Sequence, residues 1–216
     1  MNKDALEYLE EKYGKEFVIR SAESNSSSGF YSFKVYPKDE PTISFTASAY
    51  KNEKDFRDNY LKRLTGLQFQ ERDKPVIKNM FQEEFHSFYG NLVFFDEIVP
   101  DKDNVSNEQL LSVDPNLEHN YILFLQGEFT PTADTKKIVQ FLSYLKEEVH
   151  VKKGDIDIVF YNDTPKTSAE KAYLSYIGNE DVSAVISIPP EEFQKIDTVE
   201  DFSKNANVEK MNINGT

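Results

Sequence analysis

The sequence predicts an α+β protein in which an antiparallel meander flanked by helices precedes a strand-helix-strand-helix-strand half. Three patterns support this fold class. Residues 42–49 alternate polar and apolar side chains, as in a strand with one face in water. The apolar run 121–125 is typical of a strand buried on both faces. Apolar side chains at three- and four-residue spacing recur between such runs and indicate amphipathic helices.

The first elements are a helix and a three-stranded meander. Asp4 can cap a helix with an apolar face through Leu6 and Leu9, and Gly14 can end it in a left-handed turn. A polar Asn-Ser-Gly turn and a Pro-rich turn separate the strands that follow. These strands are expected at residues 16–24, 31–35 and 42–49.

Two helices and a short strand are expected next. Helical spacing begins near residue 56 and should end at Gly66, since glycine weakens a helix. It resumes after Pro75 and continues to Gly90, which would place His86 on a helix. A short apolar strand at 92–95 completes this part.

A polar stretch at 101–118 separates this part from the second half and holds at most one short helix, begun by the capping pattern of Ser106 and Gln109. We therefore divide the chain into residues 1–100, the connection 101–118 and residues 119–216. The sequence leaves open whether the second half extends the first sheet or forms its own.

The second half alternates strands and helices. Strands are expected at 121–125, 156–160 and 182–188, with helices at 130–149 and 167–178 between them and a short capped helix near 198–202. An Asn-rich tail follows. Right-handed crossovers would make these strands parallel or build a mixed sheet.

Charge is unevenly distributed along the chain. Residues 1–100 hold 14 basic and 17 acidic side chains, whereas 101–216 hold 11 and 21. The four arginines all lie in the first third: Arg20, Arg57, Arg63 and Arg72. Guanidinium binds carboxylate and phosphate in a two-pronged geometry, so an anion site should involve that third. The net charge of −13 makes nucleic acid a poor partner and also serves solubility.

Several chemistries are excluded by composition and motif. The chain has no cysteine, which removes disulfides, thiol catalysis and iron-sulfur clusters. It has no phosphate-binding glycine loop and no nucleophile elbow, and no apolar run is long enough to span a membrane. We expect no cofactor and no catalytic constellation.

The candidate binding residues are few. Asp155 and Asp157 lie two apart on a predicted strand and would present paired carboxylates on one face, or simply face water above a core of isoleucines. His119 precedes a buried strand without a visible partner. Tyr173 and Tyr176 form either a recognition surface or the core face of a helix.

A weak cation site is also suggested by the sequence. Asp101 and Asp103 begin like an oxygen-ligand calcium loop, but Val105 stands where a ligand is needed and the turn glycine is missing. No other metal site is expected.

The opening ALEYLEEKYGKEFVI, a helix ended by Lys-Tyr-Gly and followed by a strand, resembles exported ectodomains of uncharacterised lipoproteins from low-GC Gram-positive bacteria. In that group a signal and a lipidated cysteine precede such a helix. The resemblance covers about the first fifty residues. It implies an extracytoplasmic, membrane-anchored protein of the cell envelope whose lipid anchor lies upstream of this sequence.

Three functional hypotheses follow. The first is a non-enzymatic extracytoplasmic module that binds a protein or a cell-envelope component. The second is a cytoplasmic acidic immunity protein, or antagonist, that binds a basic partner through charge matching. The third is a hydrolase that uses Asp155 and Asp157. A buried polar cluster around His119 would count against the first hypothesis.

Overall fold

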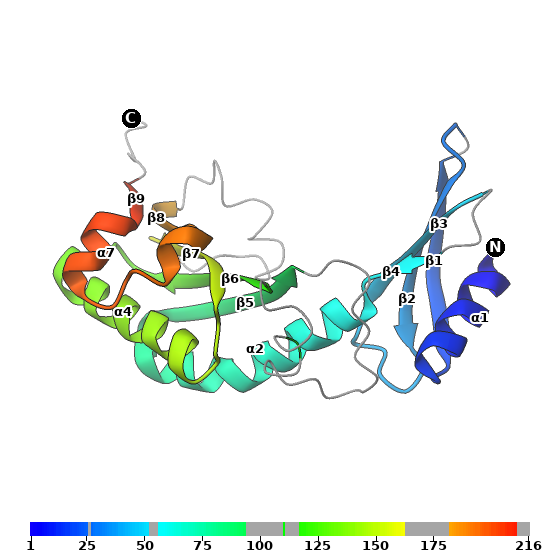
Figure 1. Cartoon of the computed structure of the whole chain (residues 1–216), viewed down its shortest axis with the longest axis horizontal. Helices are drawn as coiled ribbons and strands as arrows, with labels where there is room; N and C mark the ends of the chain where they lie inside the picture. Colours follow the sequence, from blue (N-terminus) through cyan, green and yellow to red (C-terminus); the bar gives the residue numbers. More distant parts are fainter. Residues whose placement is uncertain (26, 52–55, 94–109, 111–116, 163–181, 211–216) are drawn as a thin grey trace. The chain divides into compact units, whose positions relative to one another are not determined.

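The computed structural model describes residues 1–25, 27–51, 56–93, 110, 117–162 and 182–210 (Figure 1). The chain forms two compact units, one built on Met1–Thr65 and the other on Gly66–Val93 together with the described part of Ser106–Thr216. We call them the N-terminal and C-terminal units. Each contains its own sheet, which answers the question that the sequence left open and confirms the α+β class.

The N-terminal unit is a helix and an antiparallel meander of four strands in the order β1-β2-β3-β4. Its elements are α1 (Asn2–Tyr13), β1 (Phe17–Asn25), β2 (Phe30–Pro37), β3 (Phe45–Tyr50) and β4 (Arg57–Asp58). The first three strands confirm the prediction, whereas β4 was not expected, because two residues are too short to show a periodic pattern.

Helix α1 ends as its sequence predicts. Gly14 adopts a left-handed φ of 66°, and its N–H donates to the Glu10 carbonyl at 2.9 Å. The helix begins earlier than expected, because Met1 occupies the cap position and Asp4 lies in the first turn, where its carboxylate pairs with the N-terminal amine at 2.7 Å. Ala5 and Leu9 are fully buried.

The two helices predicted between residues 56 and 90 are wrong. A single helix, α2 (Tyr60–Phe81), passes through Gly66 and Pro75. An interior glycine costs only about 1 kcal/mol and an interior proline about 3 kcal/mol. Burial of Phe69 and Ile77 in the C-terminal unit can offset such costs.

The segment predicted as the end of a helix is a strand. Gln82 has a positive φ of 52°, and the 3-10 turn Gln82–Glu84 leads into β5 (Phe85–Val93). His86 therefore lies on a strand. Aromatic side chains favour strands, and three of them between residues 85 and 89 gave a spacing that also fitted a helix.

The C-terminal unit holds a mixed sheet in the order β5-β6-β7-β8-β9, in which β6 and β7 are parallel and the other pairs antiparallel. Its remaining elements are β6 (Glu118–Gln126), α4 (Pro131–Glu147), β7 (Lys153–Tyr161), β8 (Val182–Ile188), α6 (Pro190–Phe193), α7 (Val199–Asn205) and β9 (Asn207–Lys210). Strand β9 replaces part of the expected Asn-rich tail.

One face of this sheet forms the larger core. Helix α4 buries four apolar side chains against it, as its spacing predicted: Ile138, Phe141, Leu142 and Leu145. The sheet contributes Ile156, Ile158 and Phe160 from β7. Thr198 and Asp201 form the capping box that begins α7. Among the described helices, none is long and apolar enough to cross a membrane.

The boundary between the units lies inside α2, after Thr65. Residues 66–93 consequently belong to the second unit rather than to the first. The connection expected at 101–118 is described only at residues 110 and 117–118, so most of it, with the short helix expected at Ser106, lies outside the described residues. The helix predicted at 167–178 lies outside them as well.

Candidate functional site

The N-terminal sheet has one face in the core and one face in water. On its inner face Phe33, Val35 and Ala47 are fully buried. The opposite side chains form what we call the outer sheet face: Val18, Ser21, Glu23, Asn25, Phe30, Ser32, Lys34, Tyr36, Thr46, Ser48, Tyr50 and Arg57, with Arg20 at the bulge in β1. This alternation is what the sequence predicted for residues 42–49.

Contacts between neighbouring strands organise the outer sheet face. The Arg20 guanidinium lies over the Tyr36 ring, 5.2 Å from its centroid. Phe30 and Tyr50 are paired across β2 and β3 with their ring centroids 5.3 Å apart and nearly edge to face. The Lys34 Nζ donates to the Thr46 hydroxyl at 3.1 Å. The result is a partly ordered surface of aromatic, hydroxyl and cationic groups.

A pocket of about 240 Å³ opens at the edge of this surface, where β3 meets β4. It is lined by Thr46, Ser48, Arg57, Asp58 and Asn59. The register pairs Ser48 with Arg57. Asn59 is held by two hydrogen bonds, since its Oδ1 accepts from the Thr46 N–H at 2.7 Å and its own N–H donates to the Thr46 carbonyl at 3.1 Å. We call it the β3–β4 pocket.

The carboxylate below this pocket is already saturated. The Asp58 side chain is only 1% exposed. It accepts four hydrogen bonds, from the Tyr8 hydroxyl at 2.9 Å, the Lys12 ammonium at 2.9 Å, the Tyr13 hydroxyl at 2.7 Å and the Tyr60 N–H at 3.0 Å. These bonds join α1 to β4 and compensate the buried charge.

The charge states in this cluster are fixed by its surroundings. Burial and the Asp58 carboxylate raise the pKa of Tyr13 far above its ordinary value, so the phenol stays protonated. Burial alone would lower the pKa of Lys12, but hydrogen bonds to Tyr8 and Asp58 outweigh it and raise that pKa. Lys12 therefore stays cationic and neutralises Asp58.

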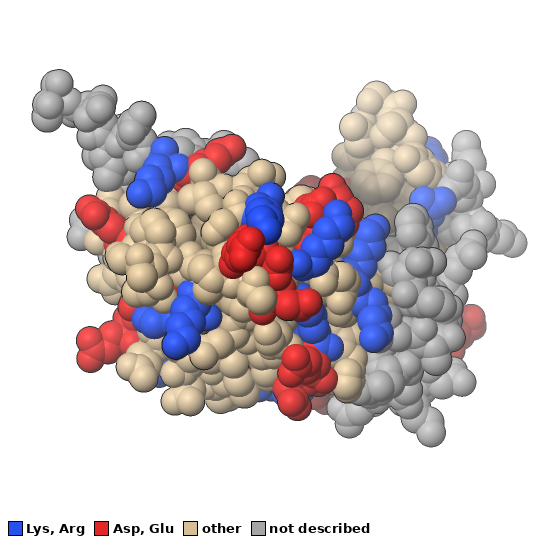
Figure 2. Space-filling view, turned by 60° about the vertical axis from the view of Figure 1, so that its left-hand side comes forward, with Lys and Arg blue, Asp and Glu red and all other residues tan. Residues whose placement is uncertain are grey.

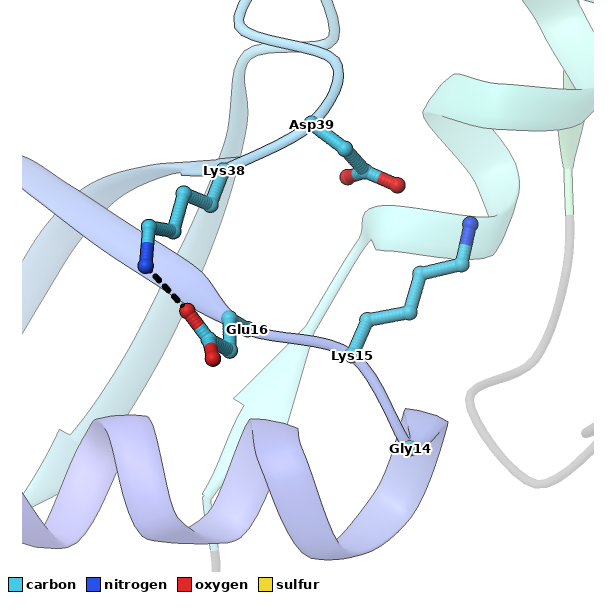
Figure 3. Close-up of a pocket in the computed structure, with 5 residues that line it drawn as sticks. All are labelled: Gly14, Lys15, Glu16, Lys38 and Asp39. Atoms are coloured by element: carbon cyan, nitrogen blue, oxygen red, sulfur yellow. Dashed lines mark hydrogen bonds and ion pairs between the residues drawn. The ribbon is translucent and has the colours of Figure 1, made fainter.

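A second pocket of about 480 Å³ lies at the end of α1, lined by Gly14, Lys15, Glu16, Lys38 and Asp39. Figure 3 shows the Lys38–Glu16 ion pair on one side of it and the side chains of Lys15 and Asp39 on the other. The paired side chains are about two-thirds exposed, at 66% and 69%. Such walls lack the burial that orders a binding site in advance.

The acidity of the chain is confined to one part. Residues 1–65 carry 11 basic and 11 acidic side chains, whereas residues 66–216 carry 14 and 27. The shift therefore falls near the boundary between the units and not near residue 100. On the face that Figure 2 shows, acidic and basic side chains are intermingled and form no single acidic patch.

The paired aspartates lie in the C-terminal unit, on β7. Asp157 accepts a hydrogen bond from the Ser187 hydroxyl at 2.6 Å. Burial raises the pKa of Asp155, and so do the carboxylates of Asp157, Glu118 and Glu191. These two side chains share a face, opposite the core isoleucines, as the sequence predicted.

His119 is buried in a stack of rings on the other face of that sheet. Its ring lies 6.1 Å from Phe69 and 5.9 Å from Tyr121, nearly parallel to both. The side chain is 0% exposed, and burial lowers its pKa to about 4. The imidazole is therefore neutral near pH 7. Its ring neighbours are aromatic, and Arg72 is the charged group that also lowers its pKa.

A second buried carboxylate, which the sequence predictions did not include, lies near this stack. Asp73 is 0% exposed, receives the Arg72 Nε at 2.6 Å and Nη2 at 2.9 Å, and accepts from the Tyr144 hydroxyl at 2.9 Å. The sequence does contain an indication that Asp73 is buried, because it lies midway between Phe69 and Ile77 on the apolar face of a helix.

The remaining candidates lie outside the described residues: Asp101, Asp103, Tyr173 and Tyr176. Within the described ranges, no group of three or more histidines and carboxylates is arranged to hold a metal ion.

Comparison with known proteins gives one distant structural match. No family profile and no curated protein matches the sequence. One solved structure is distantly similar, a crystal structure of a DUF5037 family protein from Ruminococcus gnavus ATCC 29149, at 14% identity and a TM-score of 0.40 over 89% of this chain and 77% of that one. A similarity this distant carries no functional information.

Proposed function

We propose that this protein is a non-enzymatic binding module whose contact surface is the outer sheet face. One observation carries the proposal. The face gathers Arg20, Lys34 and Arg57, against the one acidic side chain Glu23, together with the ring of Tyr50, which is 47% exposed, in a unit that carries 11 basic and 11 acidic side chains in all. Arginine and tyrosine are the residues that contribute most energy at protein interfaces.

The state of the acidic side chains supports binding over reaction. Asp58 accepts four hydrogen bonds, so it offers no lone pair for proton transfer without loss of a structural contact, whereas Asp73 accepts three, two of them from the Arg72 guanidinium. His119 is neutral and enclosed by rings. Arg72, Asp73 and Tyr144 form a partly buried polar cluster near His119, which counts against this proposal; the hydrogen bonds within the cluster give it a structural role.

The test is a comparison of binding partners between two variants. The outer-face variant carries Arg20→Ala, Lys34→Ala and Arg57→Ala; the matched control carries Lys136→Ala, Lys195→Ala and Lys204→Ala in the C-terminal unit and removes the same charge. Each is used to isolate cross-linked partners from cells of the source organism. A partner that the wild type and the control retain, and the outer-face variant loses, supports the proposal. Equal recovery by all three proteins would contradict it.

The proposal extends to location. The resemblance of the first fifty residues to lipoprotein ectodomains supports display outside the cytoplasm, where a cell-envelope component or another protein would be the partner. Protease treatment of intact native cells tests this: an exposed ectodomain is degraded, whereas a cytoplasmic protein survives until the cells are opened.

A cytoplasmic antagonist of a basic protein is the second candidate, favoured by the 27 acidic against 14 basic side chains of residues 66–216. Binding of poly-L-lysine distinguishes this antagonist from the proposed binding module. The antagonist should bind it tightly through the C-terminal unit, whereas the proposed module should bind it weakly and without dependence on the outer sheet face.

A further inference from the structure

We propose that the β3–β4 pocket is a carboxylate-binding subsite, and that the partner of the outer sheet face is an acidic polypeptide. This inference rests on the proposed function and specifies its partner. It begins from a concave feature at the edge of that face, the pocket that Arg57 and four neighbouring residues line.

The pocket is rich in hydrogen-bond donors. Arg57 offers a guanidinium, which matches the two oxygens of a carboxylate. Thr46 and Ser48 add hydroxyl groups. Asn59 uses its Oδ1 to accept from Thr46, which leaves its amide NH₂ as the donor end of a side chain already fixed in place. These groups suit an anion.

A further cation stands next to the pocket. The Lys34 ammonium lies 3.1 Å from the hydroxyl of Thr46, a residue of the pocket wall. An anion in the pocket would thus meet Arg57 from β4 and Lys34 from β2. The volume of about 240 Å³ accommodates a side-chain carboxyl group with some hydration.

The acidic member of the pocket wall does not repel such a ligand strongly. Asp58 is 1% exposed, and its charge is compensated by Lys12 on the side of α1. Both of its oxygens are occupied by donors from Tyr8, Tyr13, Lys12 and the Tyr60 backbone. The charge that an incoming carboxylate meets is therefore that of Arg57 and Lys34.

The aromatic side chains favour a polypeptide over a polysaccharide or a nucleic acid. Sugars and bases bind aromatic residues by stacking on an open ring face. On the outer sheet face Arg20 covers the Tyr36 ring, and Phe30 and Tyr50 pack nearly edge to face with each other. Tyr50 still exposes apolar area and a hydroxyl, which suits side-chain and backbone contacts.

The experiment measures binding of fluorescein-labelled poly-L-glutamate to the full chain by anisotropy, at low and high salt. The wild type should bind with an affinity that falls as salt rises. Arg57→Ala should weaken binding about tenfold, the loss expected for one charge-assisted pair. Arg57→Lys keeps the charge without the two-pronged geometry, so its affinity should lie between those of the wild type and Arg57→Ala. Lys3→Ala removes the same charge from an exposed site on α1 and should change affinity less than twofold.

Two competitors identify the class of partner. Inorganic phosphate and dextran sulfate carry anionic charge without a polypeptide backbone. We expect poly-L-glutamate to remain bound at phosphate concentrations that match its carboxylate content. Tighter binding of dextran sulfate than of poly-L-glutamate would overturn the assignment to an acidic polypeptide.

Different results would contradict the carboxylate subsite and the binding module. If Arg57→Ala binds poly-L-glutamate as the wild type does, the subsite is wrong, while loss of the native partner in the outer-face variant would still support the binding module. If the outer-face variant keeps every native partner, the binding module itself is wrong. Amide hydrogen exchange of β3 and β4 in each variant shows whether the fold is intact.

Discussion

The two sheets of this protein present opposite charges on the faces turned away from their main cores. The N-terminal sheet carries three cations and one anion on its outer face, namely Arg20, Lys34, Arg57 and Glu23, whereas β6 and β7 carry three anions and one cation, namely Glu118, Asp155, Asp157 and Lys153, the last paired with Glu118 at 2.7 Å. A net charge of −13 does not describe the outer sheet face. The charge of a whole chain therefore predicts solubility better than it predicts the partner of one face.

The units also differ in how they hold a buried carboxylate. Asp58 is bonded by three side chains that lie 45 to 50 residues away in sequence. Asp73 takes its cation from the adjacent Arg72 and has one distant partner, Tyr144. Loss of Asp58 would leave Lys12 buried to about three-quarters, whereas Arg72 is 45% exposed and can turn to water.

The largest effect should come from Asp58→Ala. Removing one partner of a buried ion pair costs about 3–5 kcal/mol, because the other charge stays buried. We expect a loss in that range for the N-terminal unit and a smaller loss, about 1–3 kcal/mol, for Asp73→Ala in the C-terminal unit. Native-state hydrogen exchange measures the free energy of unfolding of each unit separately.

Asp39→Ala is the control, since Asp39 is exposed on a loop, and it should stay within about 0.5 kcal/mol of the wild type. Equal losses in the free energy of unfolding for Asp58→Ala and Asp73→Ala would contradict the difference that we infer between the two clusters.

The next effect is a pH dependence confined to the C-terminal unit. His119 has a pKa of about 4 in the folded chain and 6.5 as its ordinary value. Between these values the unfolded chain binds a proton that the folded chain does not. Stability should thus fall as pH drops from 6.5 to 4, by up to about 3 kcal/mol, with no penalty above 6.5.

The variant His119→Phe keeps an aromatic ring in the stack with Phe69 and Tyr121 but cannot take up a proton. The difference in stability between wild type and variant should change over that pH interval and remain constant above it. A constant difference down to pH 4 would contradict the burial of a neutral histidine.

The smallest effect concerns the paired carboxylates. Asp155 lies close to Asp157, Glu118 and Glu191, whose charges raise its pKa. Asp155→Asn should relieve this repulsion and stabilise the C-terminal unit at pH 7 by less than about 0.5 kcal/mol, because the group is exposed to solvent. Urea unfolding at low and high salt tests it.

The same aspartates test the hydrolase hypothesis. Asp155→Asn with Asp157→Asn should leave binding of the native partner within about twofold of the wild type, since both lie outside the outer sheet face. Loss of a hydrolytic activity in this double variant would instead favour an enzyme.

The sequence correctly predicted those elements for which the local patterns, such as a capping residue or polar and apolar alternation, all indicate the same structure. Gly14 ends α1 with the expected left-handed turn, and the alternation of residues 42–49 gives the two faces of β3. The prediction from sequence was wrong between residues 60 and 90. Gly66 and Pro75 suggested breaks in a helix, but burial of its apolar side chains keeps α2 continuous. The spacing of the aromatic residues that follow fitted both a helix and a strand.

The candidate site was predictable only in part. The position of the arginines suggested that an anion site would involve the first third, and the structure places Arg20 and Arg57 on one face. The pocket itself depends on the pairing of Ser48 with Arg57, and Asp58 depends on partners from α1. Such long-range pairings leave no periodic signal in a single sequence.

The most direct test of the central claim is the recovery of native partners by the triple variant of Arg20, Lys34 and Arg57 against the matched lysine variant of the C-terminal unit. The account predicts that a cross-linked partner is lost only from the outer-face variant, while hydrogen exchange shows both variants folded. Retention of every partner by a folded outer-face variant would contradict it.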